Sequence, residues 1–162
     1  MPPRLMGSGS VPTSTASSIR TRRHVAETPA GRGLIDTSVV IDLDRIDHGA
    51  LPPQIAVSAI TLAELAAGPH ATDDLSERAR RQQRLQMTEA TFDPIPFDAD
   101  CARAYGLVYA ETLAAGRKAR GRRAIDLLIA ATALAAELPL YTSNPADFDG
   151  LEELIAVEHV KP

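Results

Sequence analysis

The sequence predicts an α/β protein with a central, mostly parallel β-sheet. Three observations support this prediction. Short apolar segments of strand length alternate with longer segments of helical periodicity along most of the chain. The length of 162 residues suits one compact domain, and a 44% share of hydrophobic residues is enough to build its core. Strands separated by helices need crossover connections, and such connections join parallel strands.

The first part of the chain, residues 1–32, differs in composition from the rest. Ser, Thr, Pro, Gly and Arg dominate it, and it shows no hydrophobic periodicity. Such a segment cannot bury enough apolar surface to offset the entropy lost on ordering. It also lacks the apolar region of a secretory signal. We therefore expect residues 1–32 to be a disordered leader or the result of a misassigned start, and residues 33–162 to form the folded domain.

The predicted strands are short apolar runs, and the first of them ends in a carboxylate. Residues 34–35 form this first run, and Asp36 follows directly. The second strand is predicted over residues 54–60, the third over 138–144, and a last one within 154–160. In parallel sheets the ligand site lies off the carboxyl ends of the strands, which is where Asp36 falls.

Five helices are predicted from periodicity and from residues that favour helix ends. The first is expected to be capped by Thr37 or Ser38 and the second by Ser58 or Thr61, since their hydroxyl groups accept hydrogen bonds from free backbone N–H groups. The predicted helices cover residues 37–46, 61–67, 73–90, 98–116 and 124–138.

Four carboxylates stand where a strand ends or within a turn of a helix start: Asp36, Glu64, Asp126 and Asp147. Each has an ordinary explanation by itself. Asp36 could cap a helix, Asp126 could complement a helix dipole, and Asp147 could be a turn residue. Glu64 is harder to explain, because apolar residues flank it and a half-buried, unpaired carboxylate is costly. The recurrence of the pattern favours one shared site.

Converging carboxylates repel one another, and arginines, protonation or a divalent cation must offset that repulsion. Ligands that offer only oxygen suit Mg²⁺ or Mn²⁺. Zinc fits poorly, because the four histidines are scattered and Cys101 is the single cysteine. A Mg²⁺ ion held by carboxylates and water suits phosphoryl chemistry, since it activates a bound water and neutralises charge on the phosphate.

Charge is distributed unevenly along the chain. Residues 1–32 carry five arginines against Glu27, a net charge of +4, and the whole chain carries −4, which leaves −8 on residues 33–162. So acidic a domain does not bind nucleic acid by bulk charge and would need a basic patch or bound cations. One candidate patch directly precedes Asp126. It is either a solvated loop or a phosphate-binding rim, and its basic residues are Arg117, Lys118, Arg120, Arg122 and Arg123.

Four segments in this order, "LIDTSVVIDL", "VSAITLAELAAG", "AIDLLIAATA" and "YTSNPADF", resemble the four motifs of the PIN-domain nucleases. The resemblance covers residues 33–160 and is strongest to the VapC-type toxins of bacterial toxin–antitoxin pairs. It implies a three-layer α/β/α fold and a Mg²⁺- or Mn²⁺-dependent endoribonuclease that cuts tRNA or rRNA. It also implies a cytoplasmic homodimer that a cognate antitoxin inhibits. No apolar run approaches the length of a membrane span.

The resemblance also assigns roles to individual residues. Asp36 and Asp126 would bind the metal most directly, and Glu64 and Asp147 would hold metal-bound waters or a second ion. Asp98 matches a frequently acidic position of the family, but we interpret it as a helix cap. Polar residues that would orient the acidic ligands by hydrogen bonding are Ser38, Thr142 and Asn144.

Two alternatives remain open. The first is a catalytically inactive PIN-like module that binds RNA or protein; the complete set of four acids disfavours it. The second is a phosphatase or phosphoacceptor domain with Asp36 as nucleophile. Haloacid-dehalogenase enzymes have a second Asp two residues after the first, and this chain has Ser38 there.

Overall fold

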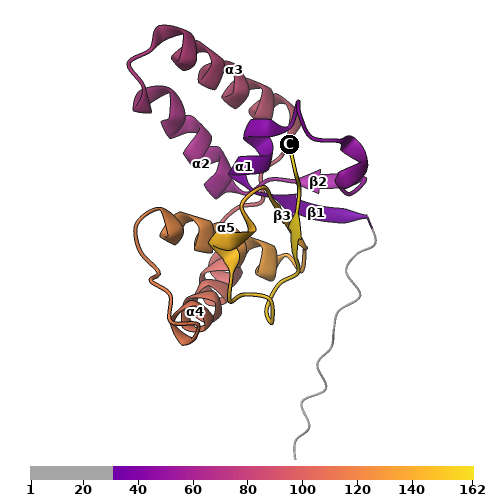
Figure 1. The fold of residues 1–162 in the computed structure, drawn as a ribbon, viewed down its shortest axis with the longest axis vertical. Coiled ribbons are helices and arrows are strands. Elements are labelled where there is room, and N and C mark those ends of the chain that lie inside the picture. The colour runs from indigo at the N-terminus through magenta and orange to yellow at the C-terminus, as the bar shows by residue number, and fades with distance from the viewer. Residues whose placement is uncertain (1–30) are drawn as a thin grey trace, which may run out of the picture.

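The computed structural model describes residues 31–162 (Figure 1). The leader expected over residues 1–32 thus lies almost entirely outside the described residues and stays a prediction. Within residues 31–162, none of the helices combines the length and the apolar character needed to cross a membrane.

The sheet has four parallel strands in the order β2-β1-β3-β4. β1 lies between β2 and β3, with Leu34 in register with Ala56 on one side and with Leu140 on the other. The predicted parallel sheet is therefore confirmed, and all four strands end at the same edge. The strands are β1 (Arg32–Ile35), β2 (Gln54–Ala56), β3 (Leu140–Thr142) and β4 (Val157–His159).

Helices cover both faces of the sheet, which makes three layers (Figure 1). Neighbouring residues of a strand point to opposite faces, and β1 shows this directly. Leu34 belongs to a core cluster with residues of α4 and α5, whereas Ile35 belongs to a second cluster with residues of α1 and α2. The α-helices are α1 (Thr37–Asp42), α2 (Ala59–Ala67), α3 (Leu75–Thr91), α4 (Ala99–Ala114) and α5 (Arg122–Ala135), and the 3₁₀ helices are η1 (His48–Ala50), η2 (Gly68–Ala71) and η3 (Pro145–Phe148).

The second strand is shorter than the predicted range of residues 54–60. β2 ends at Ala56, and α2 already begins at Ala59. The buried Ser58 Oγ accepts a hydrogen bond of 2.9 Å from the backbone N–H of Thr61 and so caps α2. This confirms Ser58 over Thr61 as the cap, and the cap ends the extended backbone although the sequence stays apolar.

The first helix is also shorter than predicted. It ends at Asp42, and the backbone N–H of Arg45 closes a turn on the Asp42 carbonyl. Ile46 extends the apolar periodicity of the sequence, since it is buried in the core, but it reaches the core from a loop. The predicted helices over 73–90 and 98–116 correspond to α3 and α4, and Asp98 caps α4 as expected.

Candidate active site at the carboxyl ends of β1 and β3

Asp36 lies at the centre of the candidate site, between the end of β1 and the start of α1. Its side chain is 6% exposed. Oδ1 accepts hydrogen bonds from the backbone N–H of Val39 at 3.0 Å and from the hydroxyl of Ser38 at 2.6 Å, while Oδ2 accepts one from the hydroxyl of Thr142 at 2.6 Å. These bonds offset the cost of burying the carboxylate and hold it in one orientation.

Asp36 is therefore also the N-cap of α1, and the prediction of Thr37 or Ser38 as the cap was wrong. Asp36 follows the strand directly and lies three residues before Val39, so its carboxylate is placed to accept from a free N–H group of the helix. Thr37 and Ser38 lie one and two residues further on. The capping bond occupies one lone pair of Oδ1, and the carboxylate has others. Capping and a role in the site are thus compatible.

Ser38 and Thr142 connect α1 to the end of β3. Each hydroxyl donates to Asp36 and also accepts a backbone N–H, from Ser143 at 3.0 Å and from Asn144 at 2.9 Å, respectively. Asn144 then starts η3, because its carbonyl oxygen accepts from the N–H of Asp147 at 3.1 Å. The structure places the three expected supporting residues together, but Asn144 contributes through its backbone.

Glu64 reaches the same edge of the sheet from α2. Its Oε2 accepts a hydrogen bond of 2.5 Å from the hydroxyl of Thr37, the first residue of α1. The sequence interpretation considered Thr37 only as a cap, so it missed this contact. A hydroxyl next to one site acid was the available signal, but its partner is 27 residues away in the chain.

Asp126 and Asp147 interact electrostatically with each other and with the acids described above. Asp126 lies in the second turn of α5 and Asp147 in η3. Burial and the charges of Asp147, Glu64 and, more weakly, Asp36 together raise the pKa of Asp126 from 3.8 to about 6, and Arg122 opposes this shift. Asp126 therefore lies within electrostatic reach of the other three acids, which come from distant parts of the chain.

The donor set fits a hard divalent cation that keeps several waters. Mg²⁺ usually binds through one or two carboxylates and retains several waters. Within residues 31–162, no group of three or more Asp, Glu, His or Cys side chains is arranged so that it could hold a metal ion by itself. One further group is compatible with an added ligand. The buried Ser143 Oγ, next to Thr142, has no hydrogen-bond partner in the described part of the chain, and such a group costs about 1–3 kcal/mol.

The residues of the basic segment fall into three groups. Lys118 and Arg120 are exposed and make no side-chain hydrogen bond or ion pair within residues 31–162. Arg122 and Arg123 belong to the first turn of α5 rather than to a loop. Arg117 donates hydrogen bonds to Ala146 and to Asp149, on either side of Asp147.

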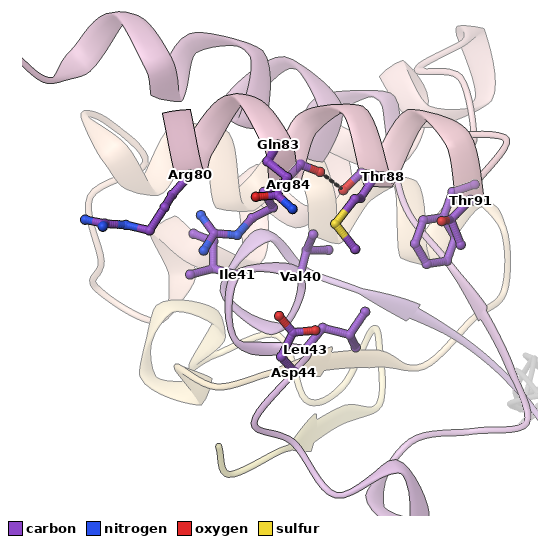
Figure 2. A pocket seen from close by; sticks show the side chains of 11 residues that line it. Val40, Ile41, Leu43, Asp44, Arg80, Gln83, Arg84, Thr88 and Thr91 are labelled. Atoms are coloured by element: carbon purple, nitrogen blue, oxygen red, sulfur yellow. Dashed lines mark hydrogen bonds between the residues drawn. The ribbon is translucent and has the colours of Figure 1, made fainter. Parts of the chain in front are cut away.

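A groove outside the acidic cluster was not predicted. It lies between α1 and α3 and has a volume of about 280 Å³ (Figure 2). The sequence suggested only a solvated face for α3, because its arginines dominate the pattern. The lining of the groove combines apolar, polar and charged side chains, namely Val40, Ile41, Leu43, Asp44, Arg80, Gln83, Arg84, Met87, Thr88, Thr91 and Phe92.

A parallel α/β/α domain that gathers four carboxylates at the carboxyl ends of its strands is the architecture of a PIN domain. The PIN domain family model matches residues 34–154, and the chain belongs to this family. Among characterised relatives, it is 33% identical to ribonuclease VapC5 of Mycobacterium tuberculosis over 85% of this chain and 99% of that protein. It is 37% identical to ribonuclease VapC8 of the same species over 67% of this chain and 96% of that protein.

Solved structures agree with the fold. The VapBC-5 toxin–antitoxin structure from M. tuberculosis contains a chain with a TM-score of 0.69 and 33% identity, which covers 82% of this chain and 99% of that one. VapBC2 from Rickettsia felis, bound to a DNA fragment from its promoter, gives a TM-score of 0.61 and 26% identity over 77% of this chain and 96% of that one. The expected three-layer PIN fold is thus confirmed.

Proposed function

We propose that this protein is the toxin of a toxin–antitoxin pair and acts as a Mg²⁺- or Mn²⁺-dependent endoribonuclease. The observation that carries the proposal is the geometry at the end of β1, where Asp36 is buried and held by three hydrogen bonds and Glu64 is bound to the adjacent Thr37. Relatives named ribonuclease VapC support the activity. The oxygen-only donor set supports the choice of cation.

We assign the direct metal contacts to Asp36 and Asp126, and the contacts to metal-bound water to Glu64 and Asp147. A bound Mg²⁺ would supply charge neutralisation at the scissile phosphate and a more acidic water. The protein's own contribution is to orient the ligands. Backbone and hydroxyl donors fix Asp36, and Thr37 fixes Glu64. Lys118 and Arg120, exposed beside the site, would bind RNA phosphates.

The direct test is cleavage of total cellular RNA by the purified chain, with tRNA and rRNA followed separately. We expect discrete internal cuts with Mg²⁺ or Mn²⁺, no cuts after chelation, and no cuts by an Asp36→Asn variant. RNA that stays intact with Mn²⁺ present, or equal cleavage by the variant, would refute the nuclease function. RNA binding without cleavage would favour the inactive PIN-like module.

Binding of the cation should depend on pH through Asp126. In the metal-free protein this group has a pKa of about 6, so it is about nine-tenths ionised at pH 7 and about one-tenth ionised at pH 5. Protons and the cation compete for the same carboxylate. We therefore expect the Mn²⁺ affinity, measured by calorimetry, to fall about tenfold between these pH values. The Mn²⁺ affinity that remains in Asp126→Asn should not fall between pH 7 and pH 5. A pH-independent affinity in the wild type would contradict the assignment of Asp126 as a metal ligand.

We further propose that the cognate antitoxin docks in the groove between α1 and α3. The similar VapBC structures are toxin–antitoxin systems, and the groove offers an apolar surface next to Arg80 and Arg84 (Figure 2). This chemistry suits an apolar antitoxin segment that carries acidic residues.

A pair of matched substitutions on α3 tests the docking site. Met87, in the groove, and Leu75, outside it, are 57% and 75% exposed. We expect Met87→Glu to weaken antitoxin binding in a co-purification titration by about tenfold or more, because it places a charge against apolar contacts. Leu75→Glu should leave the binding unchanged. Equal antitoxin binding by the two variants would show that the antitoxin docks on another surface.

The homodimer and the cytoplasmic location that the resemblance implies stay predictions. Leu107, Tyr109 and Leu113 on α4 are large apolar side chains that are 58%, 39% and 52% exposed. Tyr109 and Leu113 are one helical turn apart and share a face, whereas Leu107 lies on the opposite side of α4. Only the Tyr109–Leu113 pair therefore marks one surface that a partner would cover. Light scattering on the isolated chain would establish its oligomeric state.

A further inference from the structure

Asp147 stands on a segment with little internal support. η3 has four residues, and short 3₁₀ helices have poor hydrogen-bond geometry. Its N-cap, Asn144, makes no side-chain capping bond. Phe148, the next residue, is buried and anchors one side of the turn. The position of the Asp147 carboxylate must therefore depend on contacts from neighbouring elements.

Arg117 supplies such contacts on both sides of Asp147. Its Nη1 donates to the carbonyl oxygen of Ala146 at 2.9 Å, and its Nη2 donates to Asp149 Oδ2 at 2.5 Å. Arg123 adds a longer bond to the same Ala146 carbonyl, at 3.4 Å. One planar guanidinium thus holds two points of the chain that bracket Asp147, a geometry that a lysine cannot reproduce.

The backbone of Arg117 is itself fixed. The N–H of Arg117 donates to the carbonyl of Thr112 at 3.0 Å, and the N–H of Gly116 donates to Leu113 at 2.9 Å. Gly116 has a φ of +72°. These features form a Schellman motif, which ends α4 in a defined geometry. The guanidinium therefore extends from a rigid base rather than from a mobile loop.

A second contact joins the same two segments. Gly150 has a φ of +89°, and a Cβ at this position would lie 2.7 Å from the Cβ of Ala115, so a larger residue would force the segments apart. The end of α4 and the turn after η3 are therefore packed directly against each other. Two independent features, a guanidinium bridge and a close backbone approach, tie Asp147 to α4.

We infer that Arg117 is a positioning residue that holds Asp147 in the acidic cluster by fastening η3 to the end of α4. This inference rests on the proposed function and departs from the expectation that Arg117 binds RNA. Its guanidinium is already engaged twice and its side chain is 34% exposed, whereas Lys118 and Arg120 remain available for phosphate. The chemistry of RNA binding thus falls to those two residues.

The test compares Arg117→Ala, just after α4, with a control within α4, Arg103→Ala. Arg103 pairs with Asp100 in an exposed ion pair, and such pairs contribute little. We expect Arg117→Ala to lower kcat for RNA about tenfold to a hundredfold with little change in KM. Arg117→Lys should recover only part of the loss. Asp149→Ala should reproduce part of it, and the double variant should lose less than the sum of the two.

Two measurements do not depend on RNA cleavage. In the metal-free protein, hydrogen exchange of the amides in residues 146–150 should become faster in Arg117→Ala and stay unchanged in Arg103→Ala. The Mn²⁺ affinity of Arg117→Ala should fall about tenfold. A raised KM with unchanged kcat, exchange and Mn²⁺ affinity would make Arg117 an RNA contact and overturn the inference. If the wild type does not cut RNA, the proposed function fails, while exchange and Mn²⁺ affinity still decide the role of Arg117.

Discussion

Replacing Asp36 and Asp126 by Asn should abolish cleavage in both cases yet change stability in opposite directions. Each loss of activity should be about a thousandfold or more, as for other single catalytic groups. Asp36→Asn should destabilise the metal-free protein by about 1–3 kcal/mol. The amide nitrogen cannot accept a hydrogen bond, so a buried donor from Ser38, Val39 or Thr142 loses its acceptor.

Asp126→Asn should instead stabilise the metal-free protein at pH 7–8 by about 1 kcal/mol, after allowance for solvent screening. The folded pKa of Asp126 lies above its unfolded value, because burial and the neighbouring acids disfavour its charge. That charge therefore costs stability above about pH 6. The cost fades as the pH falls through 6 and is gone below about pH 4, where folded and unfolded states both bind the proton.

Urea denaturation of both variants and the wild type in chelator, at pH 5 and pH 8, measures these differences. The advantage of Asp126→Asn should shrink at the lower pH. Destabilisation by Asp126→Asn at pH 8 would show that Asp126 does not share a repulsive cluster, and stabilisation by Asp36→Asn would show that the hydrogen bonds of Asp36 do not outweigh the repulsion. Added Mn²⁺ should stabilise the wild type, since ligand binding to the folded state raises its stability. The gain in stability should be smaller in both variants.

Thr142→Val should reduce both stability and activity although it removes no charge. Its hydroxyl joins Asp36 to the backbone N–H of Asn144, and valine keeps the volume while leaving both partners without this contact. We expect a stability loss of about 2–3 kcal/mol and a fall in kcat of about tenfold to a hundredfold, because the metal ligand loses its orientation.

Thr132→Val provides the matched control for this change. Thr132 is equally buried, but its hydroxyl donates only to the Leu128 carbonyl one turn earlier in α5. Its replacement should cost little, because the Leu128 carbonyl belongs to the regular hydrogen bonding of the helix. Similar losses in the two variants would mean that Thr142 acts through packing and not through Asp36.

Much of this arrangement could be predicted because it is encoded locally. The apolar run before Asp36, the stop at Gly68 and the cap at Asp98 depend on neighbours within a few residues. The parallel sheet followed from the alternation of strand and helix patterns. Asp36 follows β1 directly and Asp147 follows β3 closely, and these parallel strands end at the same edge of the sheet.

The features that sequence reasoning missed all depend on distant partners. Thr37 meets Glu64 across 27 positions, and Arg117 meets Asp149 across 32. No local pattern distinguishes an arginine that will hold a turn from one that will bind a phosphate. The groove between α1 and α3 likewise arises where two helices pack, and neither helix shows it alone.

The neighbouring placement of β1 and β3 has a consequence for the newly made polypeptide. Asp36 and Thr142, which meet in the site, are 106 positions apart, and closing so long a loop is entropically costly and slow. A ribosome must finish β3 before the nuclease centre can assemble. The nascent chain therefore lacks the assembled site through most of its translation, and the site can form only once synthesis is nearly complete.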